Sequence, residues 1–211
     1  VEAQLQYLLN APIESLADLE KWLEDEKDLV NKMTEALTGH QIDFYRNTED
    51  EDFKSIYVHD QQVILPLLMK YEAELDKKCC ESPFFNQLDE NRYGLMRRVR
   101  ETKIKLFREE NIPLFTKERE LCTKYDEMMG SLTVEWDGEE KPFPFIDTKL
   151  SSLDRAVREK AYHAKVVAFR QIKPEMDSIM DELVQLRHQI AVNAGFENYR
   201  DYIFVAKNRE Y

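Results

Sequence analysis

Apolar residues recur at intervals of three and four along most of the chain, the spacing that places them on one face of an α-helix. The first long run starts at Ser15, which can cap a helix together with Asp18, and extends towards Gly39. Its apolar positions are Leu16, Leu19, Trp22, Leu23, Leu29, Val30, Met33 and Leu37. We expect Gly39 to weaken or end this amphipathic helix, and the neighbouring His40 to lie at a helix end.

A second helical run starts at Thr48, which forms a capping-box pattern with Glu51, and extends to Leu75. Pro66 lies inside this run and removes one backbone donor. The pattern therefore predicts two helical pieces in place of one continuous helix.

The Ser-Pro pair at residues 82–83 has the pattern of an N-cap followed by proline at the first helical position, which predicts another helix start. Apolar stripes then cover residues 93–107 and 116–129, with residues 111–113 (Asn-Ile-Pro) between them. We expect Gly130 to end the second of these helices.

One segment alternates apolar and polar residues instead of following helical spacing. Leu132–Trp136 alternates, Asp137-Gly138 is a strong hairpin signal, and the chain returns over Glu139–Phe145, where two prolines keep the second strand short. The pattern predicts one small β-hairpin at about residues 132–143. We expect it to pack on helices through Leu132, Val134, Trp136 and Phe143.

Helical spacing resumes after the capping pair Ser151 and Asp154 and runs to Ile172. Pro174 is expected to restart the helix, which continues to the C-cap candidate Gly195. The fold class that these patterns predict is all-α, a multi-helix array with one small β-hairpin. The hairpin suggests a boundary between an N-terminal helical region, residues 1–130, and a region of hairpin and long helices, residues 131–211.

Composition supports a globular chain with a sizeable core. The 211 residues are 43% hydrophobic, and 42 Asp and Glu against 30 Lys and Arg give a formal net charge of −12. This excess of negative charge disfavours binding to nucleic acids and to anionic membrane surfaces. No apolar run approaches the roughly 20 residues of a membrane-spanning helix. We therefore expect no nucleic-acid partner and no membrane partner.

The chain contains three cysteines, Cys79, Cys80 and Cys122, an odd number that includes two sequence neighbours. Neighbouring cysteines rarely form a mutual disulfide, and no Cys-x-x-Cys pattern is present. We interpret them as buried or half-buried thiols in a reducing compartment, which favours a cytoplasmic location.

The four histidines do not form a known metal-binding motif. None of His40, His59, His163 and His188 has a second histidine four residues away, as His-Glu-x-x-His requires, and none is preceded by Glu at the third position, as a di-iron helix bundle requires. Glu159 and His163 are four residues apart and come closest, but such pairs are usually solvated. We expect no metal site in this chain, and we would mutate His163, Glu159 and His188 first if one were found.

Basic residues cluster in one segment, at Arg97, Arg98, Arg100, Lys103, Lys105 and Arg108. Helical spacing places residues 97, 98, 105 and 108 on one face, which could meet RNA or an acidic partner. Because exposed aromatic residues are not interleaved and the chain is acidic overall, we favour a solvated or interdomain face. The five glycines are too scattered for a phosphate-binding loop.

Two phenols, a guanidinium and a carboxylate lie together after Gly195, at Tyr199, Arg200, Asp201 and Tyr202. These side chains could line a peptide-binding cleft. They could also hold the end of the long helix in place through an Arg–Asp pair and the tyrosine hydroxyls, and we favour this second interpretation.

Residues 111–202 resemble the zinc metallopeptidases of the oligoendopeptidase F family, relatives of thimet oligopeptidase. The likeness is carried by the hairpin around Trp136-Asp-Gly-Glu-Glu140, by Asp154-Arg155 and Arg158 at the start of the long helix, and by the segment "LVQLRHQIAVNAGFENYRDYIF". The segment "ESLADLEKWLEDEKDLVNKMTEAL" is less specifically similar to the family's N-terminal helices.

The resemblance implies an all-helical architecture whose N-terminal part walls a deep channel. It also implies that the zinc ligands, the His-Glu-x-x-His helix and a further Glu, belong to a C-terminal catalytic half, before which this chain stops. The function it implies is that of the N-terminal, channel-forming portion of a zinc-dependent oligoendopeptidase that hydrolyses internal bonds of short peptides, with residues 131–211 starting the peptidase domain. We expect this chain alone to be inactive and to hold no zinc or catalytic residue.

A second hypothesis from another class remains open, namely a non-enzymatic acidic helical scaffold or partner-binding module. The missing initiator Met and the ending "NREY" favour a fragment of a longer protein. A reading frame that continues past Tyr211 into His-Glu-x-x-His would distinguish the two.

Overall fold

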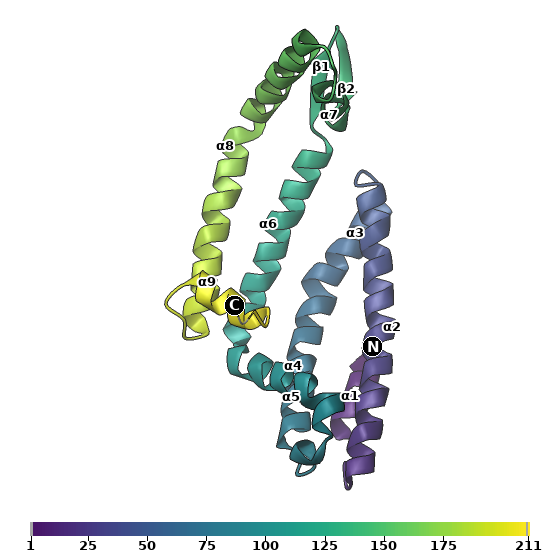
Figure 1. The fold of residues 1–211 in the computed structure, drawn as a ribbon. Helices are drawn as coiled ribbons and strands as arrows, with labels where there is room; N and C mark the ends of the chain where they lie inside the picture. The colour runs from purple at the N-terminus through teal and green to yellow at the C-terminus, as the bar shows by residue number, and fades with distance from the viewer. Residues whose placement is uncertain (1, 210) are drawn as a thin grey trace. The chain divides into compact units, whose positions relative to one another are not determined.

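A computed structural model describes residues 2–209 and 211. Within these residues the fold is all-α with a single two-stranded antiparallel hairpin, as predicted. The elements are α1 (Glu2–Asn10), α2 (Leu16–Arg46), α3 (Glu51–His59), the π-helical η1 (Asp60–Ile64), α4 (Leu65–Glu81), the 3-10 helix η2 (Phe85–Gln87), α5 (Glu90–Leu106), the 3-10 helix η3 (Glu109–Asn111), α6 (Ile112–Gly130), β1 (Thr133–Trp136), β2 (Glu139–Pro142), α7 (Pro144–Leu150), α8 (Arg155–Asn193) and α9 (Tyr199–Ala206) (Figure 1).

The chain forms two compact units. Unit 1 comprises Val1–Thr116 and Arg187–Tyr211, and unit 2 comprises Lys117–Leu186. The boundary predicted at residues 130 and 131 therefore lies inside unit 2, and the start of a peptidase domain at residue 131 stays a prediction. No helix in the described part of the chain is both long and apolar enough to span a bilayer.

Helix α2 is capped as predicted but ends later than predicted. Ser15 Oγ accepts a hydrogen bond from the Asp18 backbone N at 3.1 Å. The helix then passes through Gly39 to Arg46, so Gly39 does not end it, and the prediction that His40 lies at a helix end was wrong. A helical glycine costs only about 1 kcal/mol relative to alanine, and tertiary contacts of this part of α2, including the fully buried Phe44, offset that cost.

The second run is divided into two pieces, as predicted, although its cap was misassigned. Asp50, not Thr48, caps α3, because its Oδ1 accepts from the backbone N of Asp52 at 3.0 Å and of Phe53 at 3.2 Å. The π-helical η1 separates α3 from α4, and Pro66 lies in the first turn of α4. Proline lacks an N–H and its ring crowds the carbonyl one turn earlier, which the wider π turn accommodates.

The predicted helix start at Ser82 was also wrong. Ser82 ends α4, and its Oγ accepts from the backbone N of Phe84 in the turn that follows. The cap of the next helix, α5, is Asp89, whose Oδ1 accepts from the Arg92 backbone N at 2.8 Å. Buried Phe85 holds the intervening 3-10 turn in the core, which delays the helix by seven residues relative to Pro83.

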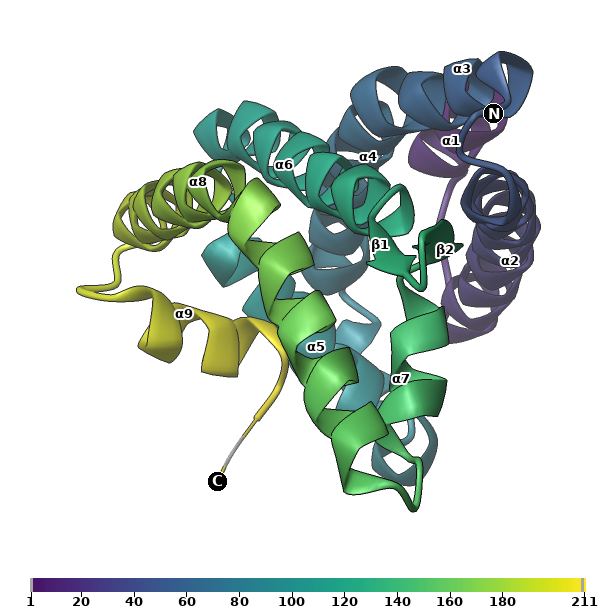
Figure 2. The ribbon, with the colours of Figure 1, turned by 90° about the horizontal axis from the view of Figure 1, so that it is seen from above.

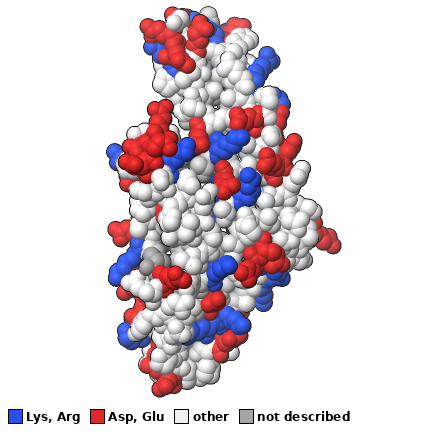
Figure 3. Space-filling model, turned by 180° about the vertical axis from the view of Figure 1, so that it is seen from behind, with Lys and Arg blue, Asp and Glu red and all other residues white. Residues whose placement is uncertain are grey.

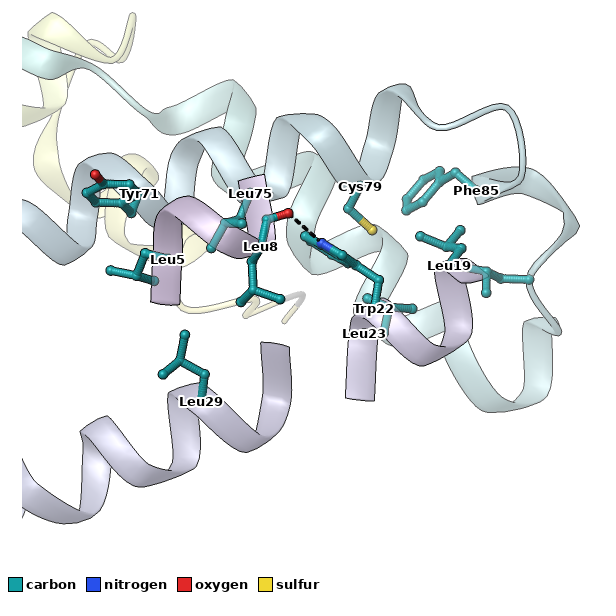
Figure 4. Packing of buried hydrophobic residues seen from close by; sticks show 11 residues of the cluster. Leu5, Leu8, Leu19, Trp22, Leu23, Leu29, Tyr71, Leu75, Cys79 and Phe85 are labelled. Carbon is teal, nitrogen blue, oxygen red and sulfur yellow. Dashed lines mark hydrogen bonds between the residues drawn. The ribbon is translucent and has the colours of Figure 1, made fainter. Parts of the chain in front are cut away.

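The core of unit 1 lies between α1, α2, α4 and η2. Helix α2 lies beside α3 (Figure 2), and α4 packs against α5. Trp22 is central to this core, and its Nε1 donates to the Leu8 carbonyl at 2.9 Å (Figure 4). Lys78 Nζ donates to the carbonyls of Leu8, Leu9 and Ala11 at 2.5–2.8 Å and so caps the C-terminal end of α1. The buried members of this cluster are Leu5, Leu8, Leu19, Trp22, Leu23, Leu29, Tyr71, Leu75, Cys79, Phe85 and Leu88.

The end of α8 and helix α9 complete unit 1. Fully buried Asn111 donates from Nδ2 to the Ile190 carbonyl at 3.1 Å and accepts from Asn193 Nδ2 at 2.7 Å. Gly195 ends α8 as predicted, with φ +88°, and hydrogen bonds from Gly195 N to Val192 O and from Phe196 N to Ala191 O form a Schellman motif. The chain can therefore turn back into α9.

Unit 2 contains the hairpin. Trp136 pairs with Glu139, and Asp137 and Gly138 both have positive φ, 55° and 82°, as a type I′ turn requires. The hairpin packs on α8 and α7 through the four predicted side chains, which join a cluster with Ile146, Ala161 and Ala168.

Three details of unit 2 differ from prediction. Residues 144–150, for which no helix was predicted, form α7. Pro144 lies in the first turn of this helix, where proline is favoured because its fixed φ suits a helix and its missing N–H is not needed. Ser151 ends α7, and Asp154 alone caps α8 by accepting from the Ala156 backbone N at 2.8 Å. Pro174 does not restart a helix, because α8 is continuous from Arg155 to Asn193 with this proline inside it.

Candidate functional site

The described part of unit 1 contains a buried group of three charged side chains from three helices: Glu26 of α2, Asp76 of α4 and Arg100 of α5. The Arg100 guanidinium donates from Nη1 to Asp76 Oδ1 at 2.5 Å and to Glu26 Oε1 at 3.2 Å, and from Nη2 to Glu26 Oε2. The side chains are 9%, 4% and 13% exposed, respectively. We call this group the charge triad.

Burial governs the electrostatics of the charge triad. Burial raises the pKa of Asp76 to about 6, although the nearby charges of Arg100 and Lys103 lower it. Burial also lowers the pKa of Arg100, but the charge of Glu26 and its hydrogen bonds more than offset this, so the net pKa lies above its usual value. Two carboxylates thus share one guanidinium, which leaves the triad with one negative charge when both are ionised.

The neighbouring cysteines, Cys79 and Cys80, have thiols of low reactivity. Cys79 is fully buried beside the charge triad, and burial raises the pKa of its thiol to about 12. Burial likewise raises the pKa of the half-buried Cys80 to about 11. None of the three cysteines forms a disulfide, and the thiols of Cys79 and Cys80 remain protonated at neutral pH, which makes them poor nucleophiles and metal ligands.

A pocket of about 200 Å³ lies next to the charge triad, between α4, α5, α9 and the start of α6. Asp76 is part of its wall, and the Lys103–Glu72 ion pair lies in the same wall. The remaining lining residues are Met69, Ala73, Val99, Thr102, Leu106, Phe107, Arg108, Phe115, Tyr202, Ala206 and Asn208. This is a mostly apolar pocket with a few polar groups, the usual composition of a small-molecule site.

Of the four site residues predicted from the sequence, Tyr202 lines this pocket and is 6% exposed. Arg200 and Asp201 are exposed and form an ion pair at 2.9 Å. Hydrogen bonds from Arg200 and Asn198 lower the pKa of Asp201. The Arg187 guanidinium lies over the Tyr199 ring, 5.7 Å from its centroid. These contacts stabilise the start of α9, and a role for the four residues in a substrate channel stays a prediction.

The histidines are dispersed. His40 Nδ1 lies 2.7 Å from Oδ2 of the buried Asp60, which ties α2 to η1. Glu159, His163 and His188 are all exposed. Among residues 2–209 and 211, no three His, Cys, Asp or Glu side chains are placed to hold a metal ion, so the residues described here do not fit a zinc centre.

The basic cluster on α5 is engaged with carboxylates. Arg97 and Arg98 both pair with Glu90, at 3.1 and 3.7 Å. Figure 3 shows the basic side chains of one face interspersed with acidic ones. Arg108 lies beyond the end of α5 and donates to the backbone carbonyls of Lys105, Phe107 and Asn193, so the predicted helix face that included it was wrong.

Sequence reasoning missed the charge triad, although a signal for two of its members was present. Asp76 lies three residues before the buried Cys79, and Glu26 lies four residues after Trp22 and three before Leu29, so each carboxylate shares a helix face with buried residues. A carboxylate at an apolar-stripe position is expected to be buried and paired, because an isolated buried charge costs several kcal/mol. The identity of the cation that pairs with them could not be read from spacing.

Comparison with known proteins identifies the fold. No protein-family model matches the chain, and no curated protein matches it. Three solved structures do match. A protein assigned as an oligoendopeptidase F gives a TM-score of 0.89 at 23% identity over 97% of this chain and 36% of that chain. PZ peptidase A with an inhibitor gives a TM-score of 0.89 at 23% identity, and the match covers 100% of this chain and 37% of that chain.

The third structure, assigned as an oligoendopeptidase F from Bacillus anthracis, gives a TM-score of 0.86 at 22% identity over 100% of this chain and 38% of that one. The chain thus spans a little more than a third of the length of each of these structures, and the match covers all or nearly all of the chain. This 211-residue chain has the fold of a portion of the oligoendopeptidase F and PZ peptidase A chains.

Proposed function

We propose that this chain is the N-terminal, non-catalytic portion of a zinc-dependent oligoendopeptidase, and that it forms part of the wall around the peptide-binding channel. The observation that carries the proposal is the fold match along 97–100% of the chain to 36–38% of three peptidase chains. The remaining length of those chains leaves room for a catalytic half that supplies the metal site, which the described residues of this chain do not form.

The proposed substrates are short peptides, cleaved at internal bonds. A site enclosed by helices admits an extended strand and excludes a folded domain, so selection by size is the expected specificity. Cys79, Cys80 and Cys122 form no disulfide, which supports a reducing compartment, and we propose the cytoplasm.

Hydrolysis by the full-length parent protein tests this proposal. We expect it to cleave a quenched fluorescent peptide of about ten residues rapidly, to spare a native globular protein, and to lose activity when a chelator removes zinc. Equal rates on the peptide and on the globular protein would contradict the enclosed channel.

The 211-residue chain alone provides the matched comparison. We expect no peptide cleavage and no stoichiometric zinc after dialysis, because a catalytic zinc site needs about three converging protein ligands. Retention of one zinc equivalent together with zinc-dependent cleavage would overturn the proposal that this chain is the non-catalytic portion. A parent protein without any peptidase activity would favour the alternative, an acidic helical scaffold.

A further inference from the structure

Asp76 has one carboxylate oxygen without a hydrogen bond, although its side chain is 96% buried. Oδ1 accepts from Arg100, whereas Oδ2 receives no hydrogen bond from any residue among 2–209 and 211. This oxygen is not among the enclosed side-chain atoms that lack a partner in the described part of the chain, so solvent or a ligand can reach it. Because Asp76 belongs to the wall of the 200 Å³ pocket, a donor bound in the pocket could form a hydrogen bond to Oδ2.

The charges around Asp76 define the sign of that donor. The triad holds two carboxylates and one guanidinium, so with both carboxylates ionised it keeps one excess negative charge. The pocket wall itself contains two cations: Lys103 pairs with Glu72, and Arg108 donates to backbone carbonyls. A cationic donor would therefore complement Asp76 better than a neutral or anionic one.

The rest of the pocket defines the body of the ligand. Phe107, Phe115 and Tyr202 provide aromatic surface, and Met69, Val99 and Leu106 provide aliphatic surface. The volume is below the roughly 300–1,000 Å³ of sites for drug-sized molecules, so it suits a group the size of one amino-acid side chain. Aromatic rings also attract cations through their faces.

We propose that this pocket binds an amphipathic cation, a primary ammonium or guanidinium group on a small apolar body, with the cationic group donating to Asp76 Oδ2 and the apolar body against Phe107, Phe115 and Tyr202. The proposal is independent of peptide hydrolysis. Its ligand could be a free amine or the N-terminal residue of a peptide, since both present the same chemistry.

Calorimetric titration of the 211-residue chain with phenethylamine tests the proposal. We expect saturable 1:1 binding that is at least about tenfold tighter than binding of the neutral phenethyl alcohol and of the anionic phenylacetate, as hydrogen bonds to charged groups allow. Equal affinities for the three probes, preferential binding of phenylacetate, or no binding of phenethylamine would overturn it.

Two variants locate the site. Asp76→Asn keeps the side-chain shape and removes the charge, and we expect it to weaken phenethylamine binding about tenfold or more. Glu81→Gln, on the same helix but outside the pocket wall and at an exposed carboxylate paired with Lys77, is the matched control and should change affinity less than about threefold. A reversed order of effects would overturn the assignment to Asp76.

Ala73→Leu keeps the assignment testable if Asp76→Asn does not fold. It leaves every charge in place and fills the pocket from the α4 wall, so we expect it to abolish binding. Unchanged binding by a folded Ala73→Leu variant would place the amine elsewhere and overturn the proposal.

The source of the cation is resolved by a second pair of probes. Phenylalanine amide represents a peptide N-terminus, and N-acetyl-phenylalanine amide lacks only the positive charge. We expect the first to bind and the second to bind at least about tenfold more weakly if peptides are the source. Binding of phenethylamine without binding of phenylalanine amide assigns the pocket to free amines.

Discussion

A carboxyl group inside an apolar wall binds a proton more readily than one in water. Burial raises the pKa of Asp76 from 3.8 to about 6, against the opposing charges of Arg100 and Lys103 and with smaller contributions from Glu72 and Glu26. The folded state therefore holds more protons than the unfolded state between about pH 4 and 6. The stability that the protonated group contributes is present below about pH 4 and is lost as pH rises through 6.

Urea unfolding of the wild type and of Asp76→Asn from pH 4 to pH 7 measures this effect. The free energy of unfolding of the wild type, taken relative to the variant, should fall by about 1–3 kcal/mol over that range. The comparison cancels the contributions of the other acidic groups. Parallel pH profiles for the two proteins would contradict a raised pKa at this position.

Arg100 illustrates the difference between a buried and an exposed ion pair. Arg100→Met removes the only guanidinium among the described residues that binds Glu26 and Asp76, and leaves two buried carboxylates facing each other. We expect a loss of about 3–5 kcal/mol in the free energy of unfolding. Arg98→Met breaks an exposed pair with Glu90 and should cost less than about 1 kcal/mol, by the same urea measurement.

At the scale of elements, two glycines have opposite roles. Gly39 lies inside α2, and an added Cβ would meet nothing within 4 Å. Gly39→Ala should therefore raise the free energy of unfolding by about 0.5–1 kcal/mol, because alanine loses less backbone entropy in a helix. Thermal unfolding followed by circular dichroism measures the change, and a lowered melting temperature would show that this glycine is needed.

Gly195 should respond in the opposite direction. Its φ of +88° belongs to the Schellman motif that ends α8, and an L side chain is strained there. Gly195→Ala should lower the free energy of unfolding by about 1–2 kcal/mol in the same assay. The pair of variants separates the two structural roles that glycine has in this chain.

Helix and strand periodicity predicted the elements well, whereas their ends were predicted unevenly. The Asp137-Gly138 turn and the Gly195 cap were correct because each has a local conformational requirement that few residues meet. The starts at Thr48 and Ser82 were wrong because several capping residues stand close together, and tertiary packing, such as the burial of Phe85, selects among them. Local sequence alone does not contain that selection.

At the scale of the whole molecule, charge pairing restricts possible partners. Arg97, Arg98, Arg100 and Lys103 of α5 bind carboxylates, and the chain has a net charge of −12. We expect no binding of a fluorescent single-stranded RNA at 100 µM protein and about 150 mM salt, since nonspecific affinity depends on lysines and arginines that can replace counterions. Saturable anisotropy at low micromolar protein would contradict this expectation.

The candidate site was less predictable than the fold. Tyr202 was identified from a local cluster of polar and aromatic residues, but Glu26, Asp76 and Arg100 are separated by as many as 74 positions. Only the packing of α2, α4 and α5 brings them together. Pairing across that distance leaves no periodic signal in one sequence, so the triad and its pocket required the structure.

In the sequence, unit 2 is inserted between the two segments of unit 1, and this order affects how the protein can fold during synthesis. Unit 2 spans residues 117–186, which is 186 − 117 + 1 = 70 residues, and closing a flexible loop of that length costs about 4 kcal/mol beyond a constant. Contacts of Leu121 with Ile179 and Leu183 join the two ends of unit 2, so its folding reduces this cost. During synthesis on the ribosome, Asn111 can form its hydrogen bonds with Ile190 and Asn193 only after those residues have emerged. A nascent chain that ends before them therefore has an incompletely folded unit 1, which is accessible to chaperones and proteases.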